Sequence, residues 1–152
     1  EESSVGQVKH ARELRGQVKD RKTDPSPETI ADLKKEVAAF SDANKFQGDS
    51  EYYLELRGED NTLEGIVGYS DDGEYFHMDF YISSGRVSGV ATRGLGELLS
   101  LALTNQKGVK VEDQPEARPV LSKFGLEKDG SVWLVSNEDL QLYFGKSDKN
   151  HG

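Results

Sequence analysis

Residues 74–103 constrain the fold of this chain more than any other stretch, because three different patterns follow one another there without a gap. EYFHMDFYIS (74–83) is apolar at most positions, SGRVSGVAT (84–92) is a basic, glycine-rich turn, and RGLGELLSLAL (93–103) continues an amphipathic helix. The apolar stripe of this helix is spaced i, i+4, i+7, i+8 and i+11 and consists of Ala91, Leu95, Leu98, Leu99 and Ala102. A strand that enters a helix through glycines leaves the first helical amides unpaired, and the helix dipole favours an anion there. The turn is therefore a candidate phosphate site.

Length and composition indicate one domain. The chain has 152 residues, of which 34% are apolar, and its mean hydropathy is −0.70. Aromatic residues and leucines concentrate from about residue 52 onward, so we expect the core to be built there. We predict a single domain over residues 1–145 and a disordered tail over residues 146–152.

The charge balance argues against polyanionic partners. There are 19 Lys and Arg against 28 Asp and Glu, a net charge of −9. A surface of this sign repels nucleic acid and anionic membranes and suits a cationic substrate, so we expect no nucleic-acid partner and no membrane. No apolar run approaches the roughly 20 residues of a membrane span, and no signal-peptide pattern opens the chain.

Several chemistries lack the residues that they need. The chain contains no cysteine, which excludes disulfides, thiol nucleophiles and Cys-ligated zinc and fits a cytoplasmic protein. His10, His77 and His151 are far apart and have no ligand spacing, so we predict no metal site. Neither a G-x-S-x-G nucleophile motif nor a Walker loop is present.

The remaining patterns predict helices and strands in a mixed order. A polar segment with a thin apolar stripe predicts a helix over residues 3–22, either solvated or forming a dimer face. Ser26 and Pro27 favour a helix start, and that helix should run to residue 44. Alternating apolar residues predict strands at 52–56, 63–69 and 74–83, and further elements are a strand at 109–111, a helix at 115–124 and a hairpin of 132–135 with 140–144. This order is that of an α/β (α+β) fold.

The glycine-rich turn also matches a family motif. Residues Arg86–Ala91 read as [Q/R]-x-x-G-x-[G/A], which resembles the pyrophosphate-binding loop of the GCN5-related N-acetyltransferase (GNAT) superfamily. Tyr81 stands where that family often has a strand valine, Gln114-x-x-Ala117 resembles its Asn-x-x-Ala, and ARPVLSKFGL (117–126) resembles its A-x-x-L-Y-x-x-x-G-F. The resemblance implies a mostly antiparallel sheet flanked by helices and acetyl-CoA as co-substrate. The cofactor-binding residues that it implies are Tyr81, Ile82, Arg86, Val87, Ser88, Gly89, Val90, Ala91 and Gln114.

The sequence departs from the family pattern in three places. The strand that precedes the first helix of the family is missing from the predicted elements. Leu121 replaces the tyrosine that often protonates the departing CoA thiolate. A second Arg-Gly-Leu-Gly at residues 93–96 could be the phosphate loop instead. If the loop begins at Arg86, Gly94 and Gly96 lie within the helix and cost about 1 kcal/mol each relative to alanine, so the Arg93 alternative stays open. We prefer Arg86, because the apolar stripe already begins at Ala91.

Candidate catalytic residues lie on the central strand and near the C-terminus. His77 and Asp79 alternate along residues 74–83 and share a face, where they could relay the proton of an amine or simply pair with each other. Glu55 and Glu64 on the neighbouring strands are rival bases. Ser122 and Tyr143 are candidate proton donors, although a tyrosine in the last strand is more often a core residue.

Two functions follow from these observations. The first is an acetyl-CoA-dependent N-acyltransferase that transfers the acetyl group directly to an amine, such as a polyamine, an aminoglycoside, or a protein lysine or N-terminus. The second is a GNAT-like domain that no longer catalyses and acts as a binding or regulatory module. An unrelated α/β fold, in which the glycine turn is only structural, is the remaining alternative.

Overall fold

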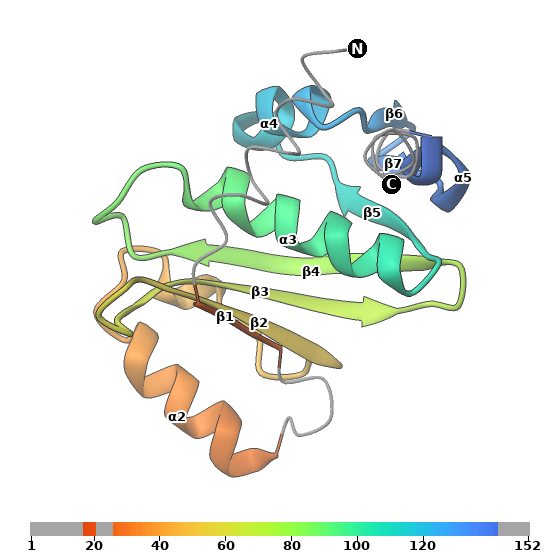
Figure 1. Cartoon of the computed structure of the whole chain (residues 1–152). Helices are drawn as coiled ribbons and strands as arrows, with labels where there is room; N and C mark the ends of the chain where they lie inside the picture. Colours follow the sequence, from red (N-terminus) through yellow and green to blue (C-terminus); the bar gives the residue numbers. More distant parts are fainter. Residues whose placement is uncertain (1–16, 21–25, 143–152) are drawn as a thin grey trace.

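A computed structural model describes residues 17–20 and 26–142, and within them the chain forms one seven-stranded sheet with helices on both faces (Figure 1). The sheet order is β1-β2-β3-β4-β5-β7-β6, and all neighbours are antiparallel except β4 and β5. The strands are β1 (Gln17–Asp20), β2 (Tyr52–Arg57), β3 (Leu63–Asp71), β4 (Tyr75–Ser83), β5 (Gly108–Glu112), β6 (Glu127–Asp129) and β7 (Val132–Val135). The mixed, mostly antiparallel sheet confirms the predicted fold class.

Helices α2 and α3 lie on opposite faces of the sheet and close two separate cores (Figure 1). The larger core, on the α3 side, contains Leu98 and Leu99 of α3, and the smaller contains Leu33 and Val37 of α2. The helical elements are α2 (Pro27–Val37), η1 (Ala43–Lys45), α3 (Val90–Thr104), η2 (Pro115–Ala117), α4 (Arg118–Lys123) and α5 (Asn137–Leu140). A sheet covered by a helix on each face buries apolar side chains on both faces, which accounts for the two cores.

The N-terminal prediction is wrong where it can be compared. Residues 17–20, predicted as part of a helix, form β1, which pairs antiparallel with β2 from Gln17↔Arg57 to Asp20↔Leu54. Pairing with the open edge of β2 outweighs a weak helical pattern here. The strand predicted to be missing before the first helix is therefore present. The rest of the proposed N-terminal helix, and with it the proposed dimer face, lies outside the described residues.

Helix α2 begins as predicted and ends earlier. Ser26 is its N-cap, with Oγ accepting from the amide of Thr29 at 3.2 Å, and Pro27 is its first residue. The helix ends at Val37 rather than near residue 44, because i→i+3 bonds such as Phe40 N to Val37 O tighten the chain into turns.

Strand β4 contains a bulge that moves its side chains from one core to the other. Gly68 pairs with Phe80 and Tyr69 with Met78, so Asp79 has no partner on β3. Without the bulge, alternation would place Met78 and Phe80 on one face. Instead Met78 packs against the α3-side core, whereas Phe80 belongs to the α2-side core.

Helix α3 fits its predicted stripe except at the first position. Leu95, Leu98, Leu99 and Ala102 are buried, but Ala91 is exposed and Val90 is buried in its place. A Cβ on Gly94 would lie 3.1 Å from both Leu56 Cδ1 and Val67 Cγ2. Glycine within the helix therefore allows α3 to approach the sheet closely.

The C-terminal region confirms the short helix and corrects the hairpin. Helix α4 ends before Gly125, which has φ +87°, as predicted for a helix-terminating glycine. Strand β7 pairs with β5 and with β6, which precedes it, and residues 140–142, the described part of the expected partner strand, are helical. Residues 137–140 form α5 because Ser136 Oγ accepts from the amide of Asp139 at 3.1 Å and caps a helix. Residues 143–152, including the proposed tail, lie outside the described residues.

Candidate active site

The sheet opens between β4 and β5, and this gap holds a pocket of about 540 Å³. The two parallel strands pair only from Tyr75↔Gly108 to Met78↔Val111, while β4 continues to Ser83. The last five residues of β4 therefore lack a partner on the β5 side. The volume is within the range of small-molecule sites, roughly 300–1,000 Å³.

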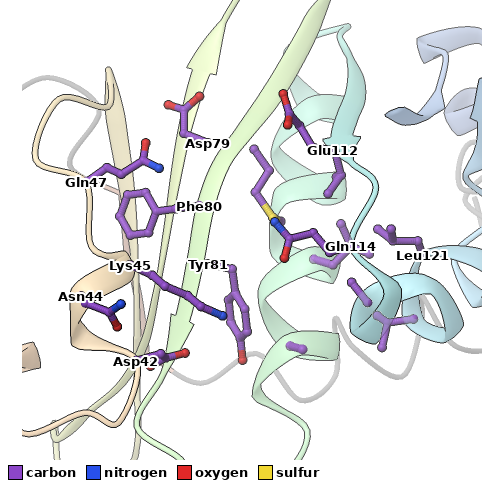
Figure 2. A pocket seen from close by; sticks show the side chains of 16 residues that line it. Asp42, Asn44, Lys45, Gln47, Asp79, Phe80, Tyr81, Glu112, Gln114 and Leu121 are labelled. Atoms are coloured by element: carbon purple, nitrogen blue, oxygen red, sulfur yellow. The ribbon is translucent and has the colours of Figure 1, made fainter. Parts of the chain in front are cut away.

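One wall of the pocket is apolar and lies on the α3 side. It combines the first turns of α3, the end of β5 and helix α4, which together hold the gap open (Figure 2). Its side chains are Ala91, Leu95, Val111, Ala117, Val120 and Leu121. Such a wall suits an extended, weakly polar chain.

The opposite wall is polar and lies on the α2 side. Asp79 of β4 and Glu112 of β5 flank the gap, and the segment after α2 faces them (Figure 2). That segment contributes Asp42, Asn44, Lys45 and Gln47. The pocket thus joins an apolar face and a polar, mainly acidic face through the sheet.

Asp79 is held in place by two neighbours. Its Oδ2 accepts from Ser70 Oγ at 2.6 Å, and its Oδ1 lies 3.2 Å from His77 Nδ1. His77 Nε2 in turn lies 3.9 Å from Glu112 Oε2. The predicted His77–Asp79 pair is therefore present, but of the two only Asp79 lines the pocket.

The rival bases Glu55 and Glu64 are engaged elsewhere. Glu55 is fully buried, and its Oε1 accepts from Arg57 Nη2 at 2.8 Å. Glu64 Oε1 accepts from Arg93 Nη1 at 2.7 Å. Neither carboxylate lines the pocket, and the Glu64–Arg93 ion pair ties β3 to α3.

The glycine-rich turn ends at the N-terminus of α3, next to the pocket. Gly89 is the N-cap, with φ +79° and no side chain capping the helix, and the first helical amide with a backbone acceptor is that of Arg93, which donates to Gly89 O at 3.0 Å. Residues 85–89 are exposed, and Ala91 lines the pocket. The amides of the first helical turn therefore face outward at the pocket rim, where a phosphate can bind.

The structure distinguishes the two candidate phosphate-loop motifs, which begin at Arg86 and at Arg93. The Arg86 frame coincides with the strand-to-helix turn, whereas Arg93 lies inside α3. The Arg93 side chain is bonded to Glu64 and to the carbonyl of Arg57 at 2.5 Å. The Arg86 guanidinium donates to Leu63 O at 3.2 Å and remains exposed beside the turn.

Of the other residues that the resemblance implies for cofactor binding, two line the pocket and one has its side chain in the core. Tyr81 and Gln114 line the pocket, and burial raises the pKa of the Tyr81 phenol to about 12. The Ile82 side chain is buried in the α2-side core, so only its backbone on the open part of β4 can contact a ligand.

Of the two candidate proton donors, only Ser122 lies within the described residues, and it does not line the pocket. Ser122 of α4 is exposed and is not a lining residue, while its neighbour Leu121 is buried in the apolar wall. Tyr143 lies outside the described residues.

Sequence reasoning missed three charged lining residues: Asp42, Lys45 and Glu112. Asp42 and Lys45 lie in a polar segment that resembles an ordinary loop, and no motif distinguishes them. Glu112 ends a strand that was predicted to stop at residue 111. Its side chain comes within 3.9 Å of His77 only because β5 lies parallel to β4.

Residues 17–20 and 26–142 contain neither a metal-ligand cluster nor a membrane-spanning helix. There, no group of three or more His, Cys, Asp or Glu side chains is arranged to hold a metal ion. Of the helices in the same part of the chain, none combines the length and apolarity that crossing a bilayer requires.

This arrangement is that of a known class of proteins: the chain has the fold of GNAT-family N-acetyltransferases. Neither a protein-family model nor a curated protein matches the sequence. A GNAT-family acetyltransferase from Bacillus anthracis has a TM-score of 0.56 at 13% identity and covers 82% of this chain and 97% of its own.

Two structures from E. coli contain coenzyme A. The GNAT-family N-acetyltransferase YhbS, in complex with CoA, has a TM-score of 0.54 at 14% identity, with 84% of each chain covered. YhhK, bound to coenzyme A, has a TM-score of 0.53 at 18% identity and covers 79% of this chain and 97% of its own. At these identities the similarity establishes the fold.

Proposed function

We propose that this protein is an acyl-CoA-dependent N-acyltransferase that transfers an acetyl group from acetyl-CoA to an amine. The observation that carries the proposal is the pocket in the β4–β5 gap. It connects the free amides at the start of α3 with a carboxylate, Asp79, on the other side of the sheet. A donor and an acceptor that enter from opposite faces would meet in the gap. A cytoplasmic location, where acetyl-CoA is available, is part of the proposal.

The residues around the gap fit CoA. The amides of residues 87–91 would bind the pyrophosphate, and Arg86 would add a charge-assisted contact after leaving the carbonyl of Leu63. The apolar wall suits the pantetheine chain, and the unpaired edge of β4 offers backbone groups to its amides. When bound, acetyl-CoA supplies an activated thioester.

Asp79 is the group that we assign to the acceptor. Its carboxylate lines the pocket and is oriented by Ser70 and His77, so it can accept a proton from an ammonium group or from a water beside it. Holding the amine next to the acyl carbon supplies the rest of the rate enhancement by proximity.

A second function is favoured by one specific observation. Leu121 takes the place of the family tyrosine, and Ser122 is exposed and does not line the pocket, so no described residue of α4 replaces that proton donor. A CoA-binding module without catalysis would have this arrangement.

Turnover separates the two functions. Because the chain contains no cysteine, a thiol reagent detects released CoA without a protein background. We expect CoA release that depends on an added amine, and a decrease in kcat of about 100-fold in Asp79→Asn. Asp49→Asn, an exposed carboxylate outside the pocket lining, is the matched control and should leave kcat unchanged. CoA binding without release, across a panel of amines, would instead establish the binding module.

A further inference from the structure

We propose that Asp113 is a positioning residue for the CoA site: by holding Arg118, it fixes helix α4 as part of the apolar wall of the pocket. This inference rests on the proposed function, since it concerns how one wall of the same pocket is kept in place. Three observations carry it: the contacts of the Asp113 carboxylate, the lining residues that these contacts hold, and the weak N-terminus of α4.

The Asp113 carboxylate accepts hydrogen bonds from two segments that follow it in the chain. Arg118 binds both of its oxygens, with Nε donating to Oδ1 at 2.8 Å and Nη2 donating to Oδ2 at 2.7 Å. Trp133 of β7 donates from Nε1 to Oδ1, also at 2.8 Å. An arginine that binds both oxygens of a carboxylate fixes its orientation as well as its distance. Asp113 therefore ties the end of β5 to both α4 and β7.

The segment between Asp113 and Arg118 carries part of the pocket wall. Asp113 directly follows β5 and Arg118 is the first residue of α4, so their ion pair spans η2. Gln114 lies within that span and lines the pocket, as do Val120 and Leu121 of α4. Figure 2 shows Gln114 and Leu121 on the same side of the pocket. Neither member of the ion pair is a lining residue, so its effect on a ligand would pass through this wall.

Helix α4 is anchored at its second half and weakly determined at its start. Leu121 and Phe124 are buried in the α3-side core and hold the second half of the helix and the residue that follows it. The N-cap residue is Ala117, whose side chain cannot accept a hydrogen bond from the first helical amides. The first turn of α4 is instead joined to β5 by the pair of Arg118 with Asp113. Without this pair we expect the first turn to shift relative to the gap while the core stays packed.

Calorimetric titration of CoA into the wild type and Asp113→Asn tests the inference, because charge and position predict opposite results. CoA is an anion, so removing a negative charge from the protein would by itself tighten its binding. A shifted α4 wall should instead weaken it, and we expect a dissociation constant about tenfold higher in Asp113→Asn. The titrations are made at pH 7, at a temperature at which urea unfolding shows both proteins folded, so that loss of the fold does not imitate weaker binding.

Arg118→Gln breaks the same pair from the other side. It should weaken CoA binding about as much as Asp113→Asn, and the double variant should bind no more weakly than either single variant. Lys110→Gln is the matched control, because it also removes a cation from an ion pair, that of Lys110 Nζ with Asp72 Oδ2 at 3.2 Å, which does not involve α4. Its dissociation constant should stay within about twofold of the wild-type value.

Turnover gives a second readout. Because the pair does not contact Asp79, both variants should raise the KM for acetyl-CoA and leave kcat within about twofold of wild type. Unchanged or tighter CoA binding in Asp113→Asn, equal affinities of Arg118→Gln and Lys110→Gln, or additive effects in the double variant would each overturn the inference and leave the proposed function intact. A wild-type protein that does not bind CoA would refute both together.

Discussion

Gly68→Ala tests the bulge that shapes the pocket-lining part of β4. A Cβ at Gly68 would overlap the Phe80 ring, with Cδ1 only 2.5 Å away, and would lie 2.6 Å from Ser50 Oγ. The ring cannot simply turn aside, because it packs edge-on against Phe46, with centroids 5.4 Å apart, and against Tyr53 at 6.2 Å. Overpacking of this kind costs about 1–3 kcal/mol, and the backbone gain from glycine to alanine offsets roughly 0.4–1 kcal/mol of it. The Cβ would lie far inside van der Waals contact with a ring that cannot move, which places the overpacking cost near the upper end of its range, so we expect a net loss of about 2 kcal/mol.

Urea unfolding with a double-mutant cycle measures this loss. In the wild-type background, Gly68→Ala should lower the unfolding free energy by about 2 kcal/mol and the melting temperature by about 4–8 °C. In a Phe80→Ala background the obstructing ring is gone, and only the Ser50 hydroxyl, which can rotate to another rotamer, still meets the Cβ. The same change should therefore cost much less than in the wild type. Additive effects, or a loss below about 0.5 kcal/mol for Gly68→Ala alone, would refute the proposed packing of Phe80 over Gly68.

Two further predictions concern ion pairs outside the pocket. Arg93→Ala should destabilise the protein by about 3 kcal/mol, measured by urea unfolding, because the Glu64 carboxylate, 17% exposed, loses its partner; a change below 1 kcal/mol would contradict this. Hydrogen bonds from Arg118 and from Trp133 hold the pKa of Asp113 well below its usual range. Since the unfolded chain binds this proton more tightly, stability should fall as pH decreases below about 5, and Asp113→Asn should reduce that dependence in urea midpoints at pH 7, 5 and 3. A mutant with the full wild-type pH dependence would show that Asp113 is not responsible.

The strand–turn–helix unit could be predicted from sequence because its signals are local. The period of the α3 stripe, the glycines of the turn and the Ser26 and Gly125 caps each report on a few consecutive residues, and the structure confirms these elements. The Arg86 and Arg93 frames could not be separated in this way. Only the packing of Gly94 against the sheet and the pairing of Arg93 with Glu64 place the second frame inside the helix.

The bulge at Asp79 could not be predicted, because the sequence reads as regular alternation through it. Phe76, Met78, Phe80 and Ile82 occupy every second position, as one face of an uninterrupted strand would. Their division between two cores depends on how β3 pairs with β4, and that pairing is a property of two distant segments. The bulge leaves Asp79 without a pairing partner on β3, and alternation alone could not predict this geometry.

The predictions for residues 17–20 and for the last hairpin were wrong for a related reason. Gln17–Asp20 has a weak pattern of its own and becomes a strand by pairing with the edge of β2, while β7 pairs with β6, the segment before it. The polar wall was equally hidden, because Asp42 and Lys45 reach the pocket from a loop more than 30 residues away from Asp79 in the chain. Local sequence patterns carry no information about contacts between segments that are distant in the chain.

The most direct test of the account is thermal unfolding with CoA, acetyl-CoA and ATP, applied to the wild type, Gly89→Ala and Gly130→Ala. Both glycines have positive φ, +79° and +67°, and open space for a Cβ, but only Gly89 begins α3. At 100 times the dissociation constant, a bound ligand adds about 2.7 kcal/mol, or roughly 5–10 °C. We predict this shift with both CoA species and not with ATP, retained in Gly130→Ala and greatly reduced in Gly89→Ala. No shift of the wild type at millimolar CoA, or equal shifts in the two variants, would contradict a CoA site at the start of α3.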